Sequence, residues 1–463
     1  MTRSITIIQR TRVLEMLEQG TPREVIAQTV GVTPGQVSAV AAHKKMGTYA
    51  SEPPTTTTHL PEDGNFPTGP RLVRTNEQAK HPNTEPAAGA ILVGIDVSDG
   101  SPIYWNPTAA ASANPHVLIL GESGYGKTYT TSCLLAELAQ SQVSSVVFDY
   151  GQGFSSASSP SLFRERARAV DFELNRDGIA INPLEIFSVD LHGPATVAQR
   201  VADTFTRVYP RIGVQQHAVI RQAVLEVLSD HGIKQFDRTT WNLRAPHFRN
   251  LERKLATLAD DVGASNRRVA LAAASHISTL FVFDTFRSSG RTLGWDDLLN
   301  RPQTWVLQLG GLESSVERAV TEFLLWNLIR FVEARGPGPL RCFVVLDEAH
   351  KMSFAPGSPV EKLLREGRKF GLGVILASQQ PEDFSPVAFA NTATKLIFQV
   401  SDDRGVISRL LYRKTRNREV GAYASEVITK LPRGSAYLVT ENTGRVVTIT
   451  SFEDRLARWR QLE

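Results

Sequence analysis

Residues 121–128 have the types and spacing of a phosphate-binding loop. They read GESGYGKT and match the pattern Gly-x-x-x-x-Gly-Lys-[Ser/Thr]. An apolar run ends immediately before the segment, and a helical pattern begins at its end. Glycines let the backbone curl so that amide groups face phosphate oxygens, while the following helix presents its positive end. The segment therefore predicts a site for nucleotide phosphates.

The loop also predicts two cofactors, ATP and Mg²⁺. The Lys127 ammonium should reach the β- and γ-phosphates, and the Thr128 hydroxyl should ligate Mg²⁺. The residues expected to contact the nucleotide are Gly121, Glu122, Ser123, Gly124, Tyr125, Gly126, Lys127, Thr128 and Tyr129.

A pair of acids follows a second apolar run, RCFVVL at 341–346. Asp347 has the position of the acid that holds Mg²⁺, partly through water. Glu348 stands one residue further from the strand, where a carboxylate can orient or deprotonate the attacking water beyond the γ-phosphate. Together with the loop at 121–128, these acids predict an ATP-hydrolysing site.

The acids open the run DEAH, which also occurs in two-lobed DEAH-box helicases. Three features argue against that class. A long helical region separates Lys127 from Asp347, the chain after Gln380 is too short for a second RecA-like lobe, and an arginine-rich Q-R-x-G-R-x-G-R segment is missing.

The residues from 116 onward alternate short apolar runs with helical patterns. Runs that are apolar on both faces are typical of interior strands of a parallel sheet. We therefore predict the α/β class, with a RecA-like P-loop core and helices on both faces of the sheet. The predicted strands are 116–120, 145–149, 304–309, 341–346, 373–378 and 394–400.

Other parts of the chain have different patterns. A helical insertion is expected over 194–286, dividing the core into 116–193 and 287–463, and the core should end in a β-hairpin and a short helix. Residues 89–115 contain two strand-like runs, ILVGIDV and PIYW, that predict a short hairpin before the core.

Residues 1–46 predict a small all-α helix-turn-helix module, followed by a Pro- and Thr-rich flexible linker at 47–88. Gly31 can form the tight turn between the second and third helices. If the module binds DNA, Gln36 and Ser38 should lie near base edges. Residues 1–50 contain six Lys/Arg and three Glu, a charge that leaves docking to a protein equally open.

The composition sets few limits on function. The 463 residues are 41% hydrophobic and carry a formal charge of +4, which permits a nucleic-acid partner without requiring one. The two cysteines, Cys133 and Cys342, lie in apolar stretches and are expected to be buried thiols. We find no long apolar run and expect a cytoplasmic protein without a membrane segment.

The segment after the acids, LLREGRKFGLGVILASQQPEDF from residue 363, resembles the HerA group among the HerA, FtsK and conjugative coupling ATPases. The resemblance covers about 89–450. It implies that Gln379, after a strand beside the P-loop strand, senses the γ-phosphate; a strand-capping glutamine is the alternative. It also implies that Asp149 lies near the nucleotide, although a turn-forming aspartate would have the same position.

The resemblance further implies an arginine that reaches the nucleotide of a neighbouring subunit. Arg365 and Arg368 are three residues apart on one predicted helix, so both can face the neighbour. The sequence does not choose between them, and a solvated helix face remains the alternative for either.

The implied function is that of a HerA-type translocase or helicase. Such a protein would form a ring, expected to be a homohexamer, act on double-stranded DNA, and work with a nuclease or other effector. Lys351, Arg287 and Arg291 are candidates for the DNA-facing pore. The alternatives are an ATP-gated scaffold for an effector in anti-phage defence and a conjugative-type DNA pump.

Two departures from the family pattern limit these implications. HerA proteins carry a sizeable β-barrel before the P-loop, whereas only short runs at about 90–106 precede it here. Docking of a nuclease through a barrel is therefore in doubt. The family also has an acid a few residues after the second strand, where this chain reads DYGQGF.

Overall fold

A computed structural model describes two units, within 1–67 and 68–463. The described residues are 12–13, 16–17, 19, 21–45, 89–109, 114–261, 266–287, 289–402, 405–415, 418–440 and 443–462. The linker expected at 47–88 lies outside them. Across the part of the chain that the structure describes, every helix is too short or too polar to span a lipid bilayer.

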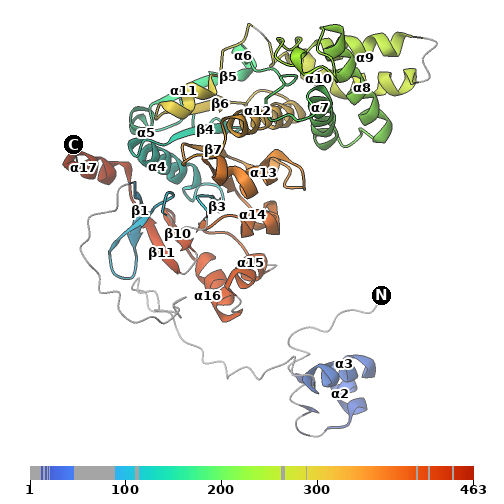
Figure 1. Ribbon diagram of the computed structural model, residues 1–463. Coiled ribbons are helices and arrows are strands. Elements are labelled where there is room, and N and C mark those ends of the chain that lie inside the picture. The colour runs from blue at the N-terminus through green and yellow to red at the C-terminus, as the bar shows by residue number, and fades with distance from the viewer. Residues whose placement is uncertain are drawn as a thin grey trace. The chain divides into compact units, whose positions relative to one another are not determined.

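An eleven-stranded sheet forms the centre of the second unit (Figure 1). Seven neighbouring strands are parallel, so their carboxyl ends meet at one edge. The α/β class with a mainly parallel sheet is thereby confirmed. In spatial order these strands are β5 (Ala169–Glu173), β6 (Thr304–Gln308), β4 (Ser144–Asp149), β7 (Cys342–Leu346), β8 (Leu372–Ser378), β3 (Val117–Leu120) and β9 (Thr394–Ile397).

Four antiparallel strands extend the sheet beyond β9. They are, in spatial order, β10 (Ser435–Val439), β11 (Gly444–Ile449), β1 (Ile91–Asp96) and β2 (Pro102–Trp105). Strands β1 and β2 form a hairpin, and so do β10 and β11. Strand β1 pairs with β11, so the short N-terminal hairpin is part of the central sheet.

Helices cover both faces of the sheet, and alternate residues of each strand enter different cores. Leu118, Leu120 and Leu376 belong to the core beneath the helical insertion, whereas Ile119 and Ile375 belong to the core beneath α4. The helices of the sheet unit outside the insertion are α4 (Lys127–Gln140), α5 (Ser161–Arg166), α6 (Leu174–Asp177), α11 (Trp295–Asn300), α12 (Ser314–Arg335), α13 (Pro359–Glu366), α14 (Pro386–Ala390), α15 (Val406–Thr415), α16 (Arg418–Ile428) and α17 (Phe452–Leu462).

The helical insertion packs on α12 through aromatic rings. It comprises α7 (Pro194–Val208), α8 (Val214–Asp230), α9 (Asn250–Asp260), α10 (Arg267–Phe283) and the 3₁₀ turn η1 (Arg238–Thr240). Phe323 of α12 meets the rings of Phe205, Phe248 and Phe286 at centroid distances of 5.5, 5.3 and 5.7 Å. Large buried rings contribute most of the apolar area at such a junction, so this cluster fixes the insertion to the core.

The C-terminal helix α17 is tied to the helix that follows the phosphate loop. The Arg455 side chain is fully buried and donates to the backbone oxygens of Leu92, Val93 and Thr450. It also pairs with Glu137 of α4 at 3.0 Å. A buried guanidinium requires this many acceptors, and the arrangement holds α17, β1 and α4 together.

The N-terminal unit contains two described helices, α2 (Arg23–Val30) and α3 (Pro34–Lys45). Gly31 between them has φ +71°, the left-handed conformation expected for the tight turn. The Gln36 side-chain oxygen accepts from the Thr33 amide at 2.8 Å, so it caps α3. The guanidinium of Arg23 donates to Ser38 Oγ at 3.5 Å. Most of the first predicted helix lies outside the described residues.

Candidate nucleotide site

The phosphate loop connects β3 to α4 at the carboxyl edge of the parallel strands. Gly124 and Gly126 have φ of +83° and +112°, which an L side chain rarely adopts. At Gly121 a Cβ atom would lie 2.5 Å from Cβ of Phe398, so only glycine fits. The three glycines therefore have the conformational and steric roles that the sequence pattern predicts.

Lys127 lies over this loop and faces the acids. Its Nζ donates to the carbonyl oxygens of Gly121 and Glu122 at 2.7 and 3.1 Å. Burial lowers the pKa of Lys127, and the charges of Glu348, Asp347 and Glu122 oppose this change. The ammonium is thus placed between the loop and a cluster of carboxylates.

The Asp347 carboxyl is buried at the end of β7. Burial, reinforced by the negative charges of Glu348 and Asp149, raises the pKa of Asp347 to about 7, although Lys127 opposes the rise. Thr128 lies beside the same cluster, since a Cβ on Gly153, in the turn after Asp149, would lie 3.0 Å from its methyl group. Clustered carboxylates and a hydroxyl are the oxygen ligands that Mg²⁺ prefers, so these residues fit that cation.

Glu348 and Gln379 are brought into direct contact. The Gln379 Nε2 donates to the Glu348 Oε1 at 3.0 Å. Glu348 has φ +62° and ψ +52°, a left-handed conformation that is costly for a non-glycine residue and occurs mostly at functional sites. The neighbouring positions of β3, β8 and β7 explain the contact, because Gln379 follows the strand between the phosphate loop and the acids.

Asp149 ends β4, the next strand beyond β7, and its side chain is fully buried. Its carboxylate accepts from the backbone amides of Gly153 and Phe154 at 3.1 and 3.0 Å. Burial raises the pKa of Asp149, and these hydrogen bonds oppose the rise. Asp149 therefore shapes the turn beside Thr128 and adds negative charge near Asp347.

Comparison with known proteins agrees with this arrangement. The family model of the central domain of helicase HerA matches residues 108–328. The DNA double-strand break repair helicase HerA of Sulfolobus acidocaldarius is 21% identical over 384 residues, which cover 78% of this chain and 70% of that protein. Over these residues the chain is similar to HerA helicases.

Solved structures of low sequence identity share the fold of this chain. VirB4 of Thermoanaerobacter pseudethanolicus is 18% identical with a TM-score of 0.62, and 79% of this chain matches 97% of that one. The bacterial conjugative coupling protein TrwB is 14% identical with a TM-score of 0.52, and the match covers 78% and 89% of the two chains. TrwB was also solved with ADP and Mg²⁺. The RecA-like P-loop fold predicted from the sequence is confirmed.

The two candidate arginines lie at the amino edge of the sheet, away from the chain's own phosphate loop. Arg365 is exposed on α13 and pairs with Glu361. Arg368 is not on that helix as expected, because α13 ends at Glu366 and Arg368 lies in the 3₁₀ turn η3 (Gly367–Phe370). Both arginines still line one groove with His116.

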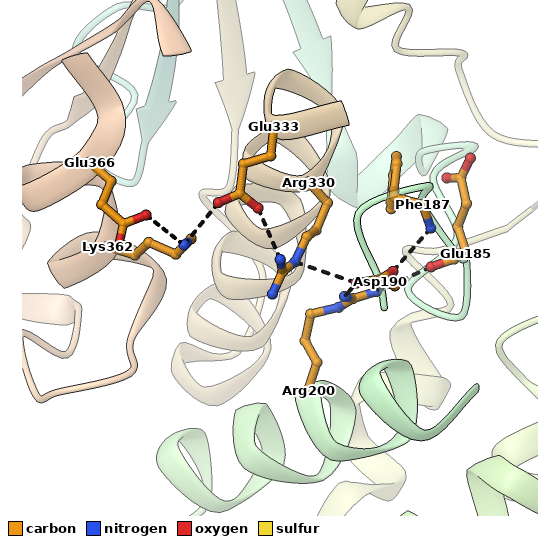
Figure 2. A network of polar contacts seen from close by, with 8 residues as sticks. All are labelled: Glu185, Phe187, Asp190, Arg200, Arg330, Glu333, Lys362 and Glu366. Carbon is orange, nitrogen blue, oxygen red and sulfur yellow. Dashed lines mark hydrogen bonds and ion pairs between the residues drawn. The ribbon is translucent and has the colours of Figure 1, made fainter. Parts of the chain in front are cut away.

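Ion pairs connect α13 to the helical insertion (Figure 2). Lys362 of α13 pairs with Glu333 of α12 at 2.8 Å, and Glu333 pairs with Arg330 at 2.9 Å. The buried Asp190 carboxylate lies 3.6 Å from Arg330 and 2.8 Å from Arg200 of α7. Breaking a buried charge network leaves uncompensated charges, so the network fixes α13 relative to the insertion.

The Tyr129 side chain packs on α17. Its hydroxyl accepts from the amide of Phe452 at 2.9 Å, and its ring packs on the Phe452 ring at 5.4 Å. A helical residue two positions after Lys127 faces the opposite side of the helix, which explains why Tyr129 contacts α17 instead of the phosphate loop.

Sequence reasoning missed two residues beside the site. The Arg433 guanidinium lies 5.9 Å from the Tyr125 ring centroid, and the Gly434 amide donates to the backbone carbonyl oxygen of Tyr125 at 3.3 Å. His350 Nδ1 lies 3.2 Å from Glu348 Oε2. Nothing near Arg433 in the sequence marks it, whereas His350 is the last residue of the DEAH run.

The proposed pore residues also have partners within the chain. Lys351 pairs with Glu317 at 2.6 Å, and Arg287 and Arg291 donate to backbone oxygens of Arg176 and Asp171. These contacts hold the three side chains against the core.

Proposed function

We propose that this chain hydrolyses ATP to ADP and phosphate with Mg²⁺. The observation that carries the proposal is the convergence of Lys127, Asp347, Glu348 and Gln379 at one sheet edge. In this arrangement the loop amides and Lys127 bind the phosphates, and Thr128 and Asp347 hold Mg²⁺, which neutralises developing phosphate charge.

Glu348 supplies the base for the attacking water. Its carboxylate stands at the turn after β7, and Gln379 holds one of its oxygens at 3.0 Å. Water loses a proton to Glu348 as its oxygen bonds to the γ-phosphorus and the bond to ADP breaks. Gln379 touches both this base and the start of the segment 380–392, so it is placed to report γ-phosphate to that segment.

The ATPase is proposed to drive movement along double-stranded DNA in a homohexameric ring. The arginines support an assembly, because they lie at the sheet edge opposite the chain's own phosphate loop and can complete the site of a neighbouring copy. An arginine supplied in this way contributes about 10³–10⁵ in rate. HerA similarity supports DNA as the track.

The test is the steady-state ATPase rate of the full chain with and without long linear duplex DNA. Lys127→Ala is the control for contaminating ATPase. A several-fold stimulation by DNA, lost in Lys127→Ala, is expected. A rate in the wild-type chain no higher than in Lys127→Ala would contradict ATP hydrolysis, and a DNA-independent rate would contradict coupling to DNA.

A second candidate is an ATP-gated scaffold for a nuclease or other effector. It is favoured by exposed apolar side chains on and beside the insertion, among them Leu191, Val214 and Phe236 with exposed fractions of 70, 88 and 94%. Leu191 and Phe236 lie at the same end of the insertion, since Arg238 donates to the Leu191 carbonyl oxygen at 3.3 Å. Neighbouring exposed apolar side chains mark protein-binding surfaces. Under this candidate, ATP turnover is unchanged by DNA and changes when the effector binds.

A further inference from the structure

His350 lies beside the free oxygen of the Glu348 carboxylate. The left-handed backbone at Glu348 leads directly into the 3₁₀ turn η2 (Ala349–Lys351), which brings the imidazole back alongside it. His350 Nδ1 lies 3.2 Å from Glu348 Oε2, while Gln379 occupies Oε1. Each carboxylate oxygen therefore has one nitrogen neighbour.

The hydrogen bonds of the Ser378 hydroxyl indicate which nitrogen of the His350 imidazole carries the proton. Ser378 Oγ donates to Asp383 Oδ2 at 2.5 Å and lies 3.3 Å from His350 Nδ1. A hydroxyl has one proton, and that of Ser378 is given to Asp383, so Ser378 accepts from His350. Nδ1 consequently carries the imidazole proton and donates it to Ser378, while the buried Glu348 Oε2 lies 3.2 Å from Nδ1 without a hydrogen-bond partner among the described residues.

The turn that carries His350 is fixed from its other side. The next residue, Lys351, pairs with Glu317 of α12 at 2.6 Å, and its Nζ lies 4.7 Å from the centroid of the Tyr150 ring. Tyr150 in turn shares a hydrogen bond of 2.8 Å with Thr321 of α12. The position of His350 is thus set by packing on α12.

The Ser378 contact connects His350 to the segment that follows β8. Asp383 ends the 3₁₀ turn η4 (Pro381–Asp383), and its Oδ2 also accepts from the Gln380 amide at 3.1 Å. When this turn is displaced, Asp383 moves with it. The Ser378 hydroxyl, which donates to Asp383 and accepts from His350, moves as well. The chain of contacts runs from η4 to Glu348.

We propose that His350 is a positioning residue that fixes the plane of the Glu348 carboxylate and links it through Ser378 to the turn at 381–383. This role rests on the proposed ATPase function. A carboxylate that is hydrogen-bonded at one oxygen and packed against a fixed imidazole at the other keeps one orientation toward the attacking water. One held only by Gln379 rotates about its terminal bond. Gln379 and His350 thus connect the base to the same segment by two routes.

The test compares His350→Ala with His350→Asn in the full chain, measuring kcat and KM for ATP. Asparagine places an N–H near the position of Nδ1, whereas alanine does not. We expect kcat to fall about 10- to 100-fold in His350→Ala, the range for a misplaced catalytic group, with KM within about twofold. His350→Asn should recover most of kcat, and melting temperatures should report that the variants are folded.

A second comparison covers the case in which His350→Ala does not fold. His350→Gln places its amide near the position of Nε2, so it should lose kcat while His350→Asn keeps it. In a Ser378→Ala chain, His350→Ala should lower kcat less than it does in the wild-type chain, because the two residues act together.

The outcomes separate this role from the ATPase function itself. A wild-type chain no more active than Lys127→Ala overturns both proposals. Robust wild-type hydrolysis with an unchanged kcat in His350→Ala overturns the positioning role alone. So does a higher KM with unchanged kcat, which would place His350 on the nucleotide, and so do equal kcat values in His350→Asn and His350→Gln.

Discussion

The carboxyl and amino edges of the parallel sheet carry opposite charge. They also differ in how many residues of the proposed site contact one another within a single chain. At the carboxyl edge, the charges of Asp347 and Glu348 act on Lys127, and Gln379 contacts Glu348, all within one chain. At the amino edge, Arg365 and Arg368 line a groove of about 470 Å³ with Lys369, His116, Leu364 and two asparagines. In the proposed ATPase, one chain supplies the base and the phosphate loop, and the arginines of the amino edge act on the nucleotide of a neighbouring copy.

The largest expected effect comes from the amino edge. Replacing the acting arginine, by Arg365→Ala or Arg368→Ala, should lower the ATPase rate of the assembled protein by about 10³–10⁵ because transition-state charge loses its partner. Nucleotide binding should persist, measured with a fluorescent ATP analogue. Lys369→Ala, in the same groove, is the matched control. Near-wild-type ATPase rates in both arginine variants would show that the arginines of the amino edge do not contribute to hydrolysis.

Glu348→Gln should have the next largest effect. Loss of the base should lower ATP hydrolysis by about 10²–10⁴, while ATP affinity is retained because the phosphate cradle is intact. Quenched-flow measurement of product and equilibrium binding would separate the two quantities. Hydrolysis at the parental rate would assign the base to another residue.

His116 provides a pH test at the amino edge. Burial is the main reason that the pKa of His116 falls to about 4, below its ordinary value of 6.5. The unfolded chain then binds more protons between these values, so this histidine makes the folded state less stable as pH falls through 6.5 toward 4. Its contribution should lower the free energy of unfolding by about 2 kcal/mol from pH 7.5 to pH 5.

Denaturant unfolding at both pH values would measure that change. In His116→Asn the additional loss at pH 5 should disappear, because the side chain no longer titrates. If the free energy of unfolding depends equally on pH in the two proteins, His116 is already protonated in the folded chain at pH 5.

The smallest expected effect belongs to Arg433 beside the phosphate loop. Arg433→Ala should raise KM for ATP about fivefold with kcat unchanged, since an exposed charge contact contributes roughly 1 kcal/mol. Steady-state kinetics would detect the change, with Arg445→Ala, on β11, as a control of equal charge. A fall in kcat would instead make Arg433 part of the catalytic step.

Local patterns predicted the carboxyl edge well. The glycine spacing requires a strand before it and a helix after it. The resemblance to HerA proteins implied that Gln379 follows a strand beside the P-loop strand, and β8 lies next to β3. Strand β5 was not predicted, because its residues 169–171 are only partly buried and its sequence AVDFE is not a continuous apolar run.

Features that depend on tertiary contacts were missed. The contact between His350 and Glu348 requires a left-handed backbone at a glutamate, which no sequence pattern signals. The end of α13 at Glu366 moved Arg368 into a separate turn. Tyr129 was assigned to the nucleotide because it adjoins the motif, although its direction is set by helix geometry and by Phe452.

Mixing two inactive variants tests most directly whether the two edges act on one nucleotide. Lys127→Ala retains the arginines, and a chain with both Arg365→Ala and Arg368→Ala retains the phosphate loop. If the site forms between copies, an equimolar mixture should regain substantial ATPase activity, because some interfaces combine an intact loop with an intact arginine edge. A mixture as inactive as its components, although the chains co-assemble, would contradict the account.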